Sequence, residues 1–585
     1  MLLSYNDTDI MIEKKWSYVP VPTDKEVKAL SALLKTQPII TKLLWQRGVQ
    51  SLSQAQDFFN PCLGHLHDPF LMKDMALAVA RIEKAIANKE HICIYGDYDV
   101  DGTTSVALLY QGLLEMGAEW LSFYIPDRAK EGYGVSEAGI AHTIEAGVDL
   151  LICVDCGTRA VDKLKVAYEY GMDIIICDHH EVGKERPPAM AMLNTKQKEC
   201  AYPFDGLSAC GIVFKLLQGI SQKRGDGQKW THHLDLVALS IAADIVPMVD
   251  ENRILMYHGL VRINENPSPG IEALKRFRNQ ESPFSVSDVV FGLAPLINAV
   301  GRMEHAIPAV KLLISKDSEQ AKGWADVLHQ QNRLRKDVDQ RITQEAFSMI
   351  EAAPLQEAII LYKAGWPKGL VGIVAARCVE NYYRPTIILT QEGEQLVGSG
   401  RSVQGYNLYE SVDHCAALLG RYGGHRQAVG LRMPLKNIDA FTTKWQARVR
   451  DTLKEASKVP LQRIDLFISL ASLTPKVLYL LGRMAPYGPA YRQPVFATFP
   501  IKVLRYHIYE DKHVKIFFSE KEESVVWEGI GFNMASLFLK LYGQTPYLSI
   551  AYKVDIDIFR GKKKIALTLK DMKAYEEEDS LARKR

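Results

Sequence analysis

Three short apolar runs, each followed directly by acidic residues, limit the fold of this chain more than any other feature. The runs are HICIY (91–95), DLLICV (149–154) and DIIIC (173–177). Helical patterns follow the first two runs, at 103–117 and 159–171. Buried strands that alternate with helices are typical of a parallel, doubly wound sheet. We therefore expect an α/β fold.

Acidic side chains and two histidines follow the ends of these runs. They are Asp97, Asp99 and Asp101 after the first run, Asp155 after the second, and Asp178, His179 and His180 after the third. Ligands of such sheets bind at the carboxyl ends of the strands, so we expect these side chains at one edge. Asp244, an acid in the otherwise apolar segment LDLVALSIAADIVPM, is a further candidate.

The clustered acids predict a metal site. Carboxylates repel each other strongly at low dielectric, so a positive charge is expected among them. Carboxylates with imidazoles suit Mn²⁺ or Mg²⁺ better than a thiolate zinc site does. More acids than one ion requires predict two ions, the usual arrangement for phosphoester hydrolysis. Each acid alone could instead be a helix N-cap or a solvated loop residue, but this explains the four groups together poorly.

The remaining composition indicates a cytoplasmic globular protein. Nine cysteines are scattered through apolar runs, as in a reducing compartment. Cys153 and Cys156 form a CxxC pair, but Cys153 lies in a strand pattern, which favours packing over a redox role. We find no run of about 18 apolar residues and expect no membrane span. A net charge of +2 does not indicate nucleic-acid binding, so any such surface must be local.

Several motifs carry a resemblance to a known family. CDHHE (177–181) resembles the signature of the DHH phosphoesterase superfamily. With YGDYDVDG (95–102) and VDCG (154–157), it is similar to the RecJ branch, bacterial exonucleases that degrade single strands from 5′ to 3′. The segments IPDRAKEGYG (125–134), LINAVGRM (296–303), GSGRS (398–402) and YGGHRQAVGL (422–431) follow in the RecJ order. The resemblance spans roughly residues 75–500.

The resemblance implies roles for the acidic positions. Asp99 and Asp101 match the DxD metal ligands, with Asp97 as an additional ligand. Asp155 matches the carboxylate that bridges the two ions. The other direct ligands would be His179 and Asp244. The two remaining residues, Asp178 and His180, would orient the ligands or contact the scissile phosphate. The implied activity is metal-dependent degradation of single-stranded DNA to 5′-mononucleotides in recombination and DNA repair.

The resemblance also implies contacts with the substrate. GSGRS would hold the 5′-phosphate, with help from the bare backbone N–H groups of its glycines. Arginine suits bidentate contact with phosphate, although either arginine outside GSGRS could be a surface ion-pair partner instead. A histidine in YGGHRQAVG could equally be a packed residue. The implied substrate-binding residues are Arg128, Arg302, Ser399, Gly400, Arg401, Ser402, Gly423, Gly424 and His425.

Changes of pattern along the chain divide it into six parts. They are an N-terminal segment (1–75), a DHH catalytic domain (76–315), a connecting helix (316–353), a second, DHH-associated α/β domain that binds nucleic acid (354–457), a β-domain (458–572) and a disordered tail (573–585). Alternation of apolar and polar residues predicts antiparallel strands in the β-domain. The resemblance implies an OB-fold there. Its expected DNA-binding surface is Tyr506, Tyr509, His513, Lys515, Arg560, Lys562 and Lys563.

Three places depart from the RecJ pattern. Pro367 replaces a histidine, Val300 replaces a small residue, and Ala490-Tyr491 stand where Gly-Asn is expected. A diverged paralogue with an altered grip on DNA is therefore an alternative. Two further alternatives are a DHH phosphoesterase of short oligoribonucleotides or cyclic dinucleotides, and a non-catalytic single-strand-binding scaffold. The length of the chain argues against the DHH phosphoesterase, and the intact acids argue against the scaffold. The resemblance implies single-stranded DNA, single-strand-binding protein and a RecQ-type helicase as partners.

Overall fold

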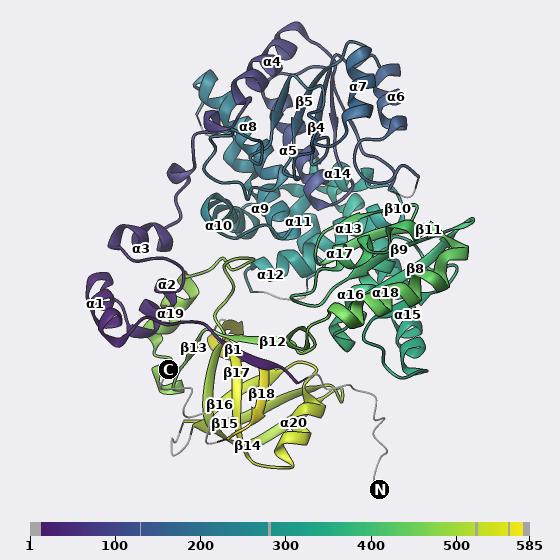
Figure 1. Cartoon of the computed structure of the whole chain (residues 1–585). Coiled ribbons are helices and arrows are strands. Elements are labelled where there is room, and N and C mark those ends of the chain that lie inside the picture. Colours follow the sequence, from purple (N-terminus) through teal and green to yellow (C-terminus); the bar gives the residue numbers. More distant parts are fainter. Residues whose placement is uncertain are drawn as a thin grey trace. The chain divides into compact units, whose positions relative to one another are not determined.

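The computed structural model describes residues 13–576 except 129, 228, 279–281, 521–524 and 560–561, without the side chains at 229, 456, 556–559 and 562–564 (Figure 1). The chain forms two compact units. The first, called the acidic unit here, is Gln56–Arg335 with Met484–Arg492. The second, the barrel unit, is Met1–Ala55, Lys336–Arg483 and Gln493–Arg585. The chain thus passes between the units four times.

A five-stranded parallel sheet organises the acidic unit, as expected. Its strands are β2 (Ile92–Tyr95), β3 (Leu121–Tyr124), β4 (Leu150–Val154), β5 (Asp173–Cys177) and β6 (Ala191–Leu193), in the order β3-β2-β4-β5-β6. Alternate side chains enter two different cores. Ile92 and Ile94 pack with α4 (Met75–Asn88), α5 (Val100–Glu115) and α8 (Ala209–Arg224). Cys93 and Tyr95 pack with α6 (Glu137–Glu145) and α7 (Val161–Glu169), which cover the other face (Figure 1).

A second group of helices completes the acidic unit. It contains α9 (Leu234–Ala243), α10 (Asp250–Glu265), α11 (Pro269–Lys275), α12 (Val286–Asp288), a π-helical turn η4 (Val289–Leu293), α13 (Ala294–Met303) and α14 (Ile307–Leu313). Helices α9 and α10 touch at Gly259, where a Cβ would lie 2.4 Å from the carbonyl oxygen of Leu234. A larger residue would force these two helices apart.

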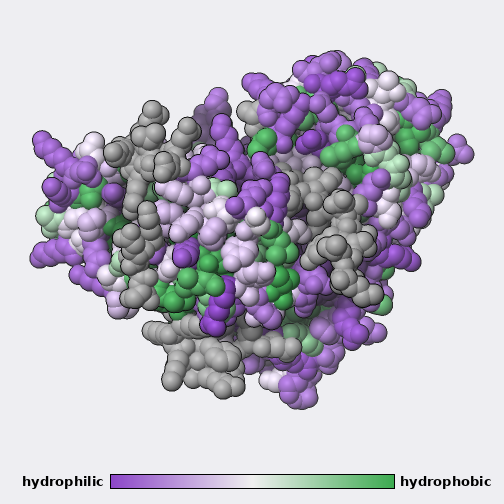
Figure 2. Space-filling view, turned by 90° about the horizontal axis from the view of Figure 1, so that it is seen from below, coloured by the Kyte–Doolittle hydropathy of each residue, from purple (hydrophilic) through white to green (hydrophobic). Residues whose placement is uncertain are grey.

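The segment Val286–Met303 is long and apolar enough by composition to cross a membrane, with a mean hydropathy of 1.2. In this fold its buried residues Val289, Leu293 and Ile297 belong to the core that α5 and α9 also line. Core helices of globular proteins have the same composition. On the face seen in Figure 2, hydrophobic residues form scattered patches among hydrophilic ones.

Arg253 on α10 holds the isolated segment Met484–Arg492 within the acidic unit. Its Nη2 donates to the carbonyl oxygens of Met484 and Ala485, at 3.2 and 3.3 Å. Its guanidinium lies 5.5 Å from the ring centre of Tyr491, which is buried and donates to the Met484 carbonyl. Ala490 has a φ of 59°, in the left-handed region. Alanine therefore adopts here a backbone conformation that favours glycine, the residue that the RecJ pattern predicts at this position.

The second α/β domain lies in the barrel unit. Its sheet has the order β10-β11-β9-β8-β7, formed by β7 (Ile359–Tyr362), β8 (Thr386–Glu392), β9 (Gln395–Arg401), β10 (Arg421–Gly424) and β11 (Ala428–Pro434). The long helix α15 (Ser318–Glu351) and α16 (Val371–Tyr382) pack in one core. The other core contains α17 (Leu408–Asp413) and α18 (Ile438–Thr452). Helix α15 lies in the stretch 316–353; its Leu328 enters the core of the acidic unit, and its Ile342 enters a core of the barrel unit.

The C-terminal strands close into a barrel. They are β14 (Phe496–Tyr509), β15 (His513–Glu520), β16 (Trp527–Gly531), β17 (Tyr547–Phe559) and β18 (Lys562–Ala574), with α20 (Ala535–Tyr542) between β16 and β17. The short strand β13 (Leu466–Phe467) pairs with β14 outside the ring. Pairing of β14 with both β15 and β17 completes the circle. Strand β18 includes Lys573 and Ala574, so the predicted start of a disordered tail at 573 was wrong; residues 577–585 of that tail lie outside the described residues.

The N-terminal segment was not predicted to take part in the barrel unit, but its first part does. Strand β1 (Lys15–Tyr18) pairs in parallel with β12 (Leu461–Ile464), and α2 (Pro38–Trp45) packs on α19 (Pro475–Arg483). Helices α1 (Asp24–Leu34) and α3 (Leu52–Phe59) flank α2 in the sequence. Trp16 is buried beside the barrel and donates its Nε1 hydrogen to Asp571, at 2.6 Å.

We expect Trp16→Ala to destabilise the barrel unit by about 3–5 kcal/mol, because it removes a buried indole and leaves the Asp571 carboxylate without this donor. Thermal or urea unfolding followed by tryptophan-independent circular dichroism measures the change. Ser17→Ala, at an exposed position of the same strand, serves as the control. Equal stability of the two variants would contradict the role given to Trp16.

Candidate active site

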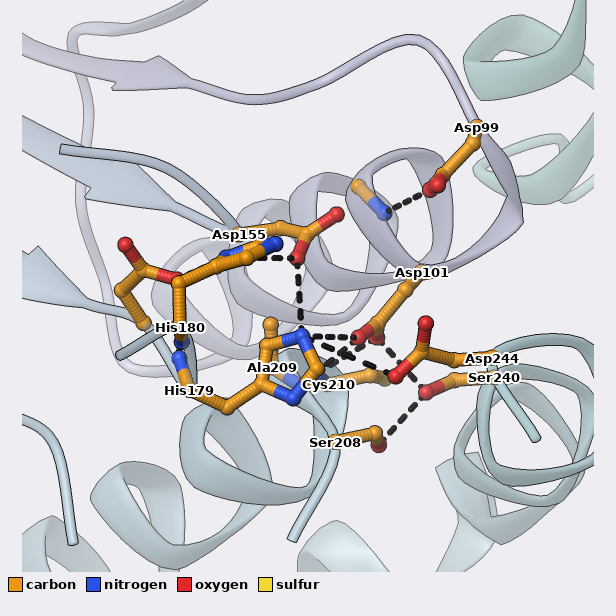
Figure 3. Close-up of polar contacts among 12 residues, drawn as sticks. Asp99, Asp101, Asp155, His179, His180, Ser208, Ala209, Cys210, Ser240 and Asp244 are labelled. Carbon is orange, nitrogen blue, oxygen red and sulfur yellow. Dashed lines mark hydrogen bonds and ion pairs between the residues drawn. The ribbon is translucent and has the colours of Figure 1, made fainter. Parts of the chain in front are cut away.

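Asp101 and Asp155, two of the acids predicted from the strand ends, lie around His179 together with Asp244 (Figure 3). His179, which follows β5, is at the centre of the group. Its Nε2 atom lies 3.5 Å from Asp155 Oδ1, 3.8 Å from Asp101 Oδ2 and 3.6 Å from Asp244 Oδ2. Asp244 is the C-cap of α9 and approaches from outside the sheet. Three sequence segments and one separate helix therefore meet at one point.

The donor atoms of the six predicted ligands fall into two adjoining groups, each with its atoms within 4.8 Å of one another. One consists of Asp97, Asp99 and Asp155, and the other of Asp101, His179 and Asp244; a third group of the same size overlaps both and combines Asp155 and His179 with His180. Asp155 joins them, because its Oδ1 also lies beside His179. Carboxylate oxygens with a single imidazole are a donor set for Mn²⁺ or Mg²⁺.

Burial and mutual repulsion raise the pKa of these carboxyl groups. Burial, followed by the charges of Asp101 and Asp99, raises the pKa of Asp244 to about 8. Burial and the neighbouring acids also raise the pKa of Asp155 well above its ordinary value. Such shifts mean that carboxylates in this position need an added positive charge to stay ionised together.

Asp97 gives a second indication of a bound cation. It is almost completely buried, and among the described residues neither of its carboxylate oxygens has a hydrogen-bond partner. Burial and then the charge of Asp99 raise its pKa well above the ordinary value. The backbone N–H groups of Tyr98 and Gly134 lower the pKa of Asp97, but by less than burial and Asp99 raise it. Neither N–H group has the geometry of a hydrogen bond to the carboxylate. Buried polar atoms are normally paired, so these two oxygens fit a metal ion.

Asp101 is held by the N-terminus of α8. Its Oδ2 accepts from the backbone N–H of Ala209 at 2.8 Å, and its Oδ1 accepts from that of Cys210 at 2.9 Å. The hydroxyl of Ser240 on α9 donates to the same Oδ1 at 2.7 Å (Figure 3). The hydroxyl of Ser208 lies 2.6 Å from the hydroxyl of Ser240. A helix N-terminus stabilises a carboxylate through its unpaired N–H groups and its dipole.

The turn after β2 requires glycine at position 102. A Cβ there would lie 2.4 Å from the carbonyl oxygen of Asp97, closer than any carbon can approach. Asp99 caps α5 by accepting from the N–H of the same Gly102 at 3.1 Å. The DxDG sequence thus starts the helix and aims its acids at one place.

Asp178 holds the DHH loop and is not a member of any of these donor groups. Its Oδ2 accepts from the N–H of Thr158 at 3.0 Å, and its Oδ1 accepts from Nδ1 of His180 at 2.7 Å. Burial acts to raise the pKa of Asp178, but these hydrogen bonds outweigh burial and keep the pKa well below its ordinary range. The same hydrogen bond raises the pKa of His180 despite burial.

Tyr133 and Asn194 support this loop and were not predicted. The hydroxyl of Tyr133 lies 2.8 Å from Nε2 of His180, so both ring nitrogens of that histidine are engaged. Asn194 donates to the carbonyl oxygen of His180 at 2.9 Å. Asn194 directly follows β6, so the short apolar run AML before it was the signal that could have revealed it.

The predicted arginines of this unit lie near Tyr98, the residue between Asp97 and Asp99 in the sequence. The guanidinium of Arg128 lies 4.9 Å from the centre of the Tyr98 ring. Burial raises the pKa of Tyr98, and the charges of Arg128 and Arg302 act against it. Gly301 allows α13 to approach Tyr98 closely, because a Cβ at this position would lie only 2.7 Å from the Tyr98 carbonyl oxygen. This approach brings the next residue, Arg302, close to Tyr98. The two arginines thus border the acidic group.

GSGRS takes a different form from the one predicted. It forms the end of β9, which pairs with β8 on one side and β11 on the other. Its glycine N–H groups lie in a central strand, so the expectation that they approach an anion was wrong; the glycines give room for close packing. The side chains differ in role: Arg401 donates to Ser399 Oγ at 2.7 Å, whereas buried Ser402 donates to the Tyr406 carbonyl.

The glycine-rich hairpin lies at the edge of the same sheet. Gly423 and Gly424 end β10, and His425 begins an exposed turn. Gly424 has a φ of 140°, and a Cβ there would lie 2.3 Å from the carbonyl oxygen of Ala428. His425 is exposed rather than packed, so its ring is available to a ligand.

The remaining sequence features have structural explanations. Cys153 and Cys156 are free and buried in the core beside α6 and α7, in agreement with the packing interpretation. Pro367 accepts from the N–H of Leu370 in the turn before α16, where its own missing N–H is no loss. Val300 is buried in the core of the acidic unit.

Three family models match the chain. They are the DHH family N-terminal domain at residues 91–241, the DHHA1 domain at 355–451 and the RecJ OB domain at 464–571. The single-stranded-DNA-specific exonuclease RecJ of Bacillus subtilis is 36% identical over 94% of this chain and 70% of its own length. The RecJ of Dickeya dadantii is 30% identical over 91% of this chain and 96% of its own length. The chain belongs to the RecJ family.

A solved structure agrees with this RecJ assignment. The crystal structure of Thermus thermophilus RecJ in complex with Mn²⁺ has a TM-score of 0.83 and 25% identity, over 96% of this chain and 80% of that one. The RecJ OB match coincides with the closed barrel, and the DHH match with the parallel sheet. The acids that the RecJ resemblance matches to metal ligands, Asp99, Asp101, Asp155 and Asp244, are all present.

We expect Asp178→Asn to lower the turnover of DNA about 10- to 100-fold while the protein stays folded, because the amide cannot accept all of the N–H groups that now hold the loop. Steady-state cleavage of a single-stranded oligonucleotide measures the effect. Asp162→Asn on the exposed side of α7 is the control. An unchanged rate in Asp178→Asn would exclude a positioning role.

Proposed function

We propose that this protein is a metal-dependent exonuclease that degrades single-stranded DNA from the 5′ end to 5′-mononucleotides, in recombination and DNA repair. The observation that carries the proposal is the group of buried carboxylates at the strand ends, with the unpaired Asp97, in a chain of the RecJ family. The closed barrel and the second α/β domain argue against the shorter phosphoesterases of small oligonucleotides. The complete set of acids argues against a non-catalytic scaffold.

The proposed ligands for two Mn²⁺ or Mg²⁺ ions are the two adjoining groups: Asp97, Asp99, Asp101, Asp155, His179 and Asp244. The RecJ of Thermus thermophilus was solved with Mn²⁺, which supports this choice. Two such ions would supply a hydroxide at neutral pH and charge that offsets the phosphate. The N-terminus of α8 orients the proposed ligand Asp101. Asp178 orients His180, which is not one of these ligands.

His180 and Tyr133 are proposed to face the scissile phosphate. The ring of His180 is partly exposed, and the hydrogen bond that it donates to Asp178 favours its charged form. Arg128 and Arg302 beside Tyr98 offer guanidinium groups to the same strand. Ser399 and Arg401, in the barrel unit, are proposed to recognise the 5′-phosphate, and the Gly423–His425 hairpin to contact the backbone of the DNA.

The barrel is proposed to bind the single strand further along. Tyr506 and Tyr509 on β14 are exposed and can stack on bases. Lys515 forms an ion pair with Glu528 at 3.2 Å, so its charge is partly used within the fold. Of the other predicted residues, Arg560 and the side chains of Lys562 and Lys563 lie outside the described residues. By family, single-strand-binding protein and a RecQ-type helicase are proposed partners, in the cytoplasm.

An oligonucleotide labelled at either end tests polarity and metal dependence. We expect immediate release of a 5′ label as mononucleotide with Mn²⁺ or Mg²⁺, survival of the 3′ label on shortening fragments, and no cleavage in chelator. Asp155→Ala should lower the rate by a factor on the order of 1,000, since metal charge stabilisation is worth several kcal/mol. Glu169→Ala, exposed on α7, should cleave at the wild-type rate. Full activity of Asp155→Ala would refute the two-metal proposal.

Recognition of the 5′-phosphate is tested separately. Arg401→Ala should lose about 1.5–3 kcal/mol of preference for 5′-phosphorylated over 5′-hydroxyl DNA, because a charged hydrogen bond to the phosphate is removed. Competition between the two substrates measures this preference. Arg432→Ala removes a like charge from the same sheet, where it pairs with Glu392, and should keep the preference. A preference that survives in Arg401→Ala would place the phosphate elsewhere.

A further inference from the structure

A cluster of two histidines and a glutamate lies outside the acidic group. Glu115 is the last residue of α5, and His232 and His233 end the 3₁₀ turn η3 (Lys229–His233). Both histidines direct Nε2 at the same oxygen, Glu115 Oε1, at 3.1 Å for His232 and 3.2 Å for His233. The centres of the two rings lie 4.0 Å apart.

These separations match the edge of a tetrahedral metal site. Zinc bonds to nitrogen and carboxylate oxygen of about 2.0–2.1 Å place neighbouring ligand atoms roughly 3.3–3.4 Å apart. The side chain of His233 is only 6% exposed, whereas those of Glu115 and His232 are 38% and 42% exposed. The site is therefore anchored on one side and open to water on the other, as a three-ligand site that completes its shell with water requires.

The donor set differs from that of the six proposed ligands of the acidic group, which are five carboxylates and one imidazole. Two imidazoles and one carboxylate suit Zn²⁺, while Mn²⁺ and Mg²⁺ prefer sites rich in oxygen. We propose that Glu115, His232 and His233 form a separate zinc site in this protein, distinct from the proposed catalytic metals.

The place of the cluster indicates what such an ion would do. Helix α5 carries Asp101 in its first turn and Glu115 at its end, about 20 Å apart at 1.5 Å per residue. Helix α9 is capped by His233 at its start and by Asp244 at its end. The two helices pack side by side, and Ser240 of α9 bonds Asp101 of α5. They therefore run antiparallel, and the zinc ion ties together the far ends of the two helices that carry Asp101 and Asp244.

The test counts zinc in the full-length protein. Wild type, His232→Gln and Glu115→Gln are stripped with chelator, given Zn²⁺ in the presence of excess Mg²⁺, desalted and analysed for bound zinc. His65→Gln is the control, because His65 is 50% exposed and faces a single acid, Asp57, at 3.8 Å. We expect wild type and His65→Gln to hold one more equivalent of zinc than either cluster variant. Co²⁺ in place of Zn²⁺ should give a visible absorption band that both cluster variants lose.

Thermal unfolding gives a second readout that does not depend on nuclease activity. Zn²⁺ should raise the midpoint of wild type more than that of either cluster variant. The rate of cleavage with Mn²⁺ should stay within about twofold of wild type in both, since the cluster lies a helix length from the acidic group. Equal zinc content in wild type and both cluster variants would overturn the proposal and leave the three side chains as hydrogen-bond partners only. Loss of the exonuclease activity in all proteins, with zinc still bound, would reject the proposed function and keep the zinc site.

Discussion

Repulsion among buried carboxylates is the constraint around which the acidic unit is built. Asp97, Asp101 and Asp155 are almost completely buried at the carboxyl edge of one sheet. Water cannot screen them there, and the pKa of Asp155 and of Asp97 is raised accordingly. The protein offsets only part of this cost itself, through the N-terminus of α8 at Asp101. The remainder is left for a ligand, which makes the site both unstable when empty and selective for cations.

Repulsion also explains why hydrogen bonds hold the acids in place. A carboxylate with a free choice of rotamer would turn away from its neighbours. Asp99 is fixed by its cap on Gly102, and Asp101 by three donors. Asp178, by contrast, turns its charge to the DHH loop and thereby sets the ring of His180. Preorganised acids of this kind bind metal without first paying for reorientation.

The sequence was informative where a local pattern determines the position of a side chain. An apolar run that ends in an acid places that acid at a sheet edge, so the proposed ligands that follow β2, β4 and β5 could be predicted with the parallel sheet, whereas Asp244 was indicated by its place in an apolar segment that forms α9. Ser240 could not be predicted, because a small polar residue inside an apolar helix gives no indication of what it faces. Tyr133 could not be predicted either, because it contacts His180 from a loop far away in the sequence. The expected role of the glycine N–H groups in GSGRS was wrong, because glycines occur both in phosphate-binding loops and in tightly packed central strands, and the sequence does not distinguish the two.

The segment Met484–Arg492 bears on how this protein can be divided. A fragment that stops after α19 would keep every residue of the DHH match, yet it would remove the carbonyl oxygens of Met484 and Ala485 that Arg253 binds. A fragment that begins at the barrel would in turn lack β1 and Trp16. The boundaries at which homologous domains are recognised are thus not boundaries at which the polypeptide can be cut. Insertion, deletion and exchange of domains in this lineage would have to carry these small pieces along.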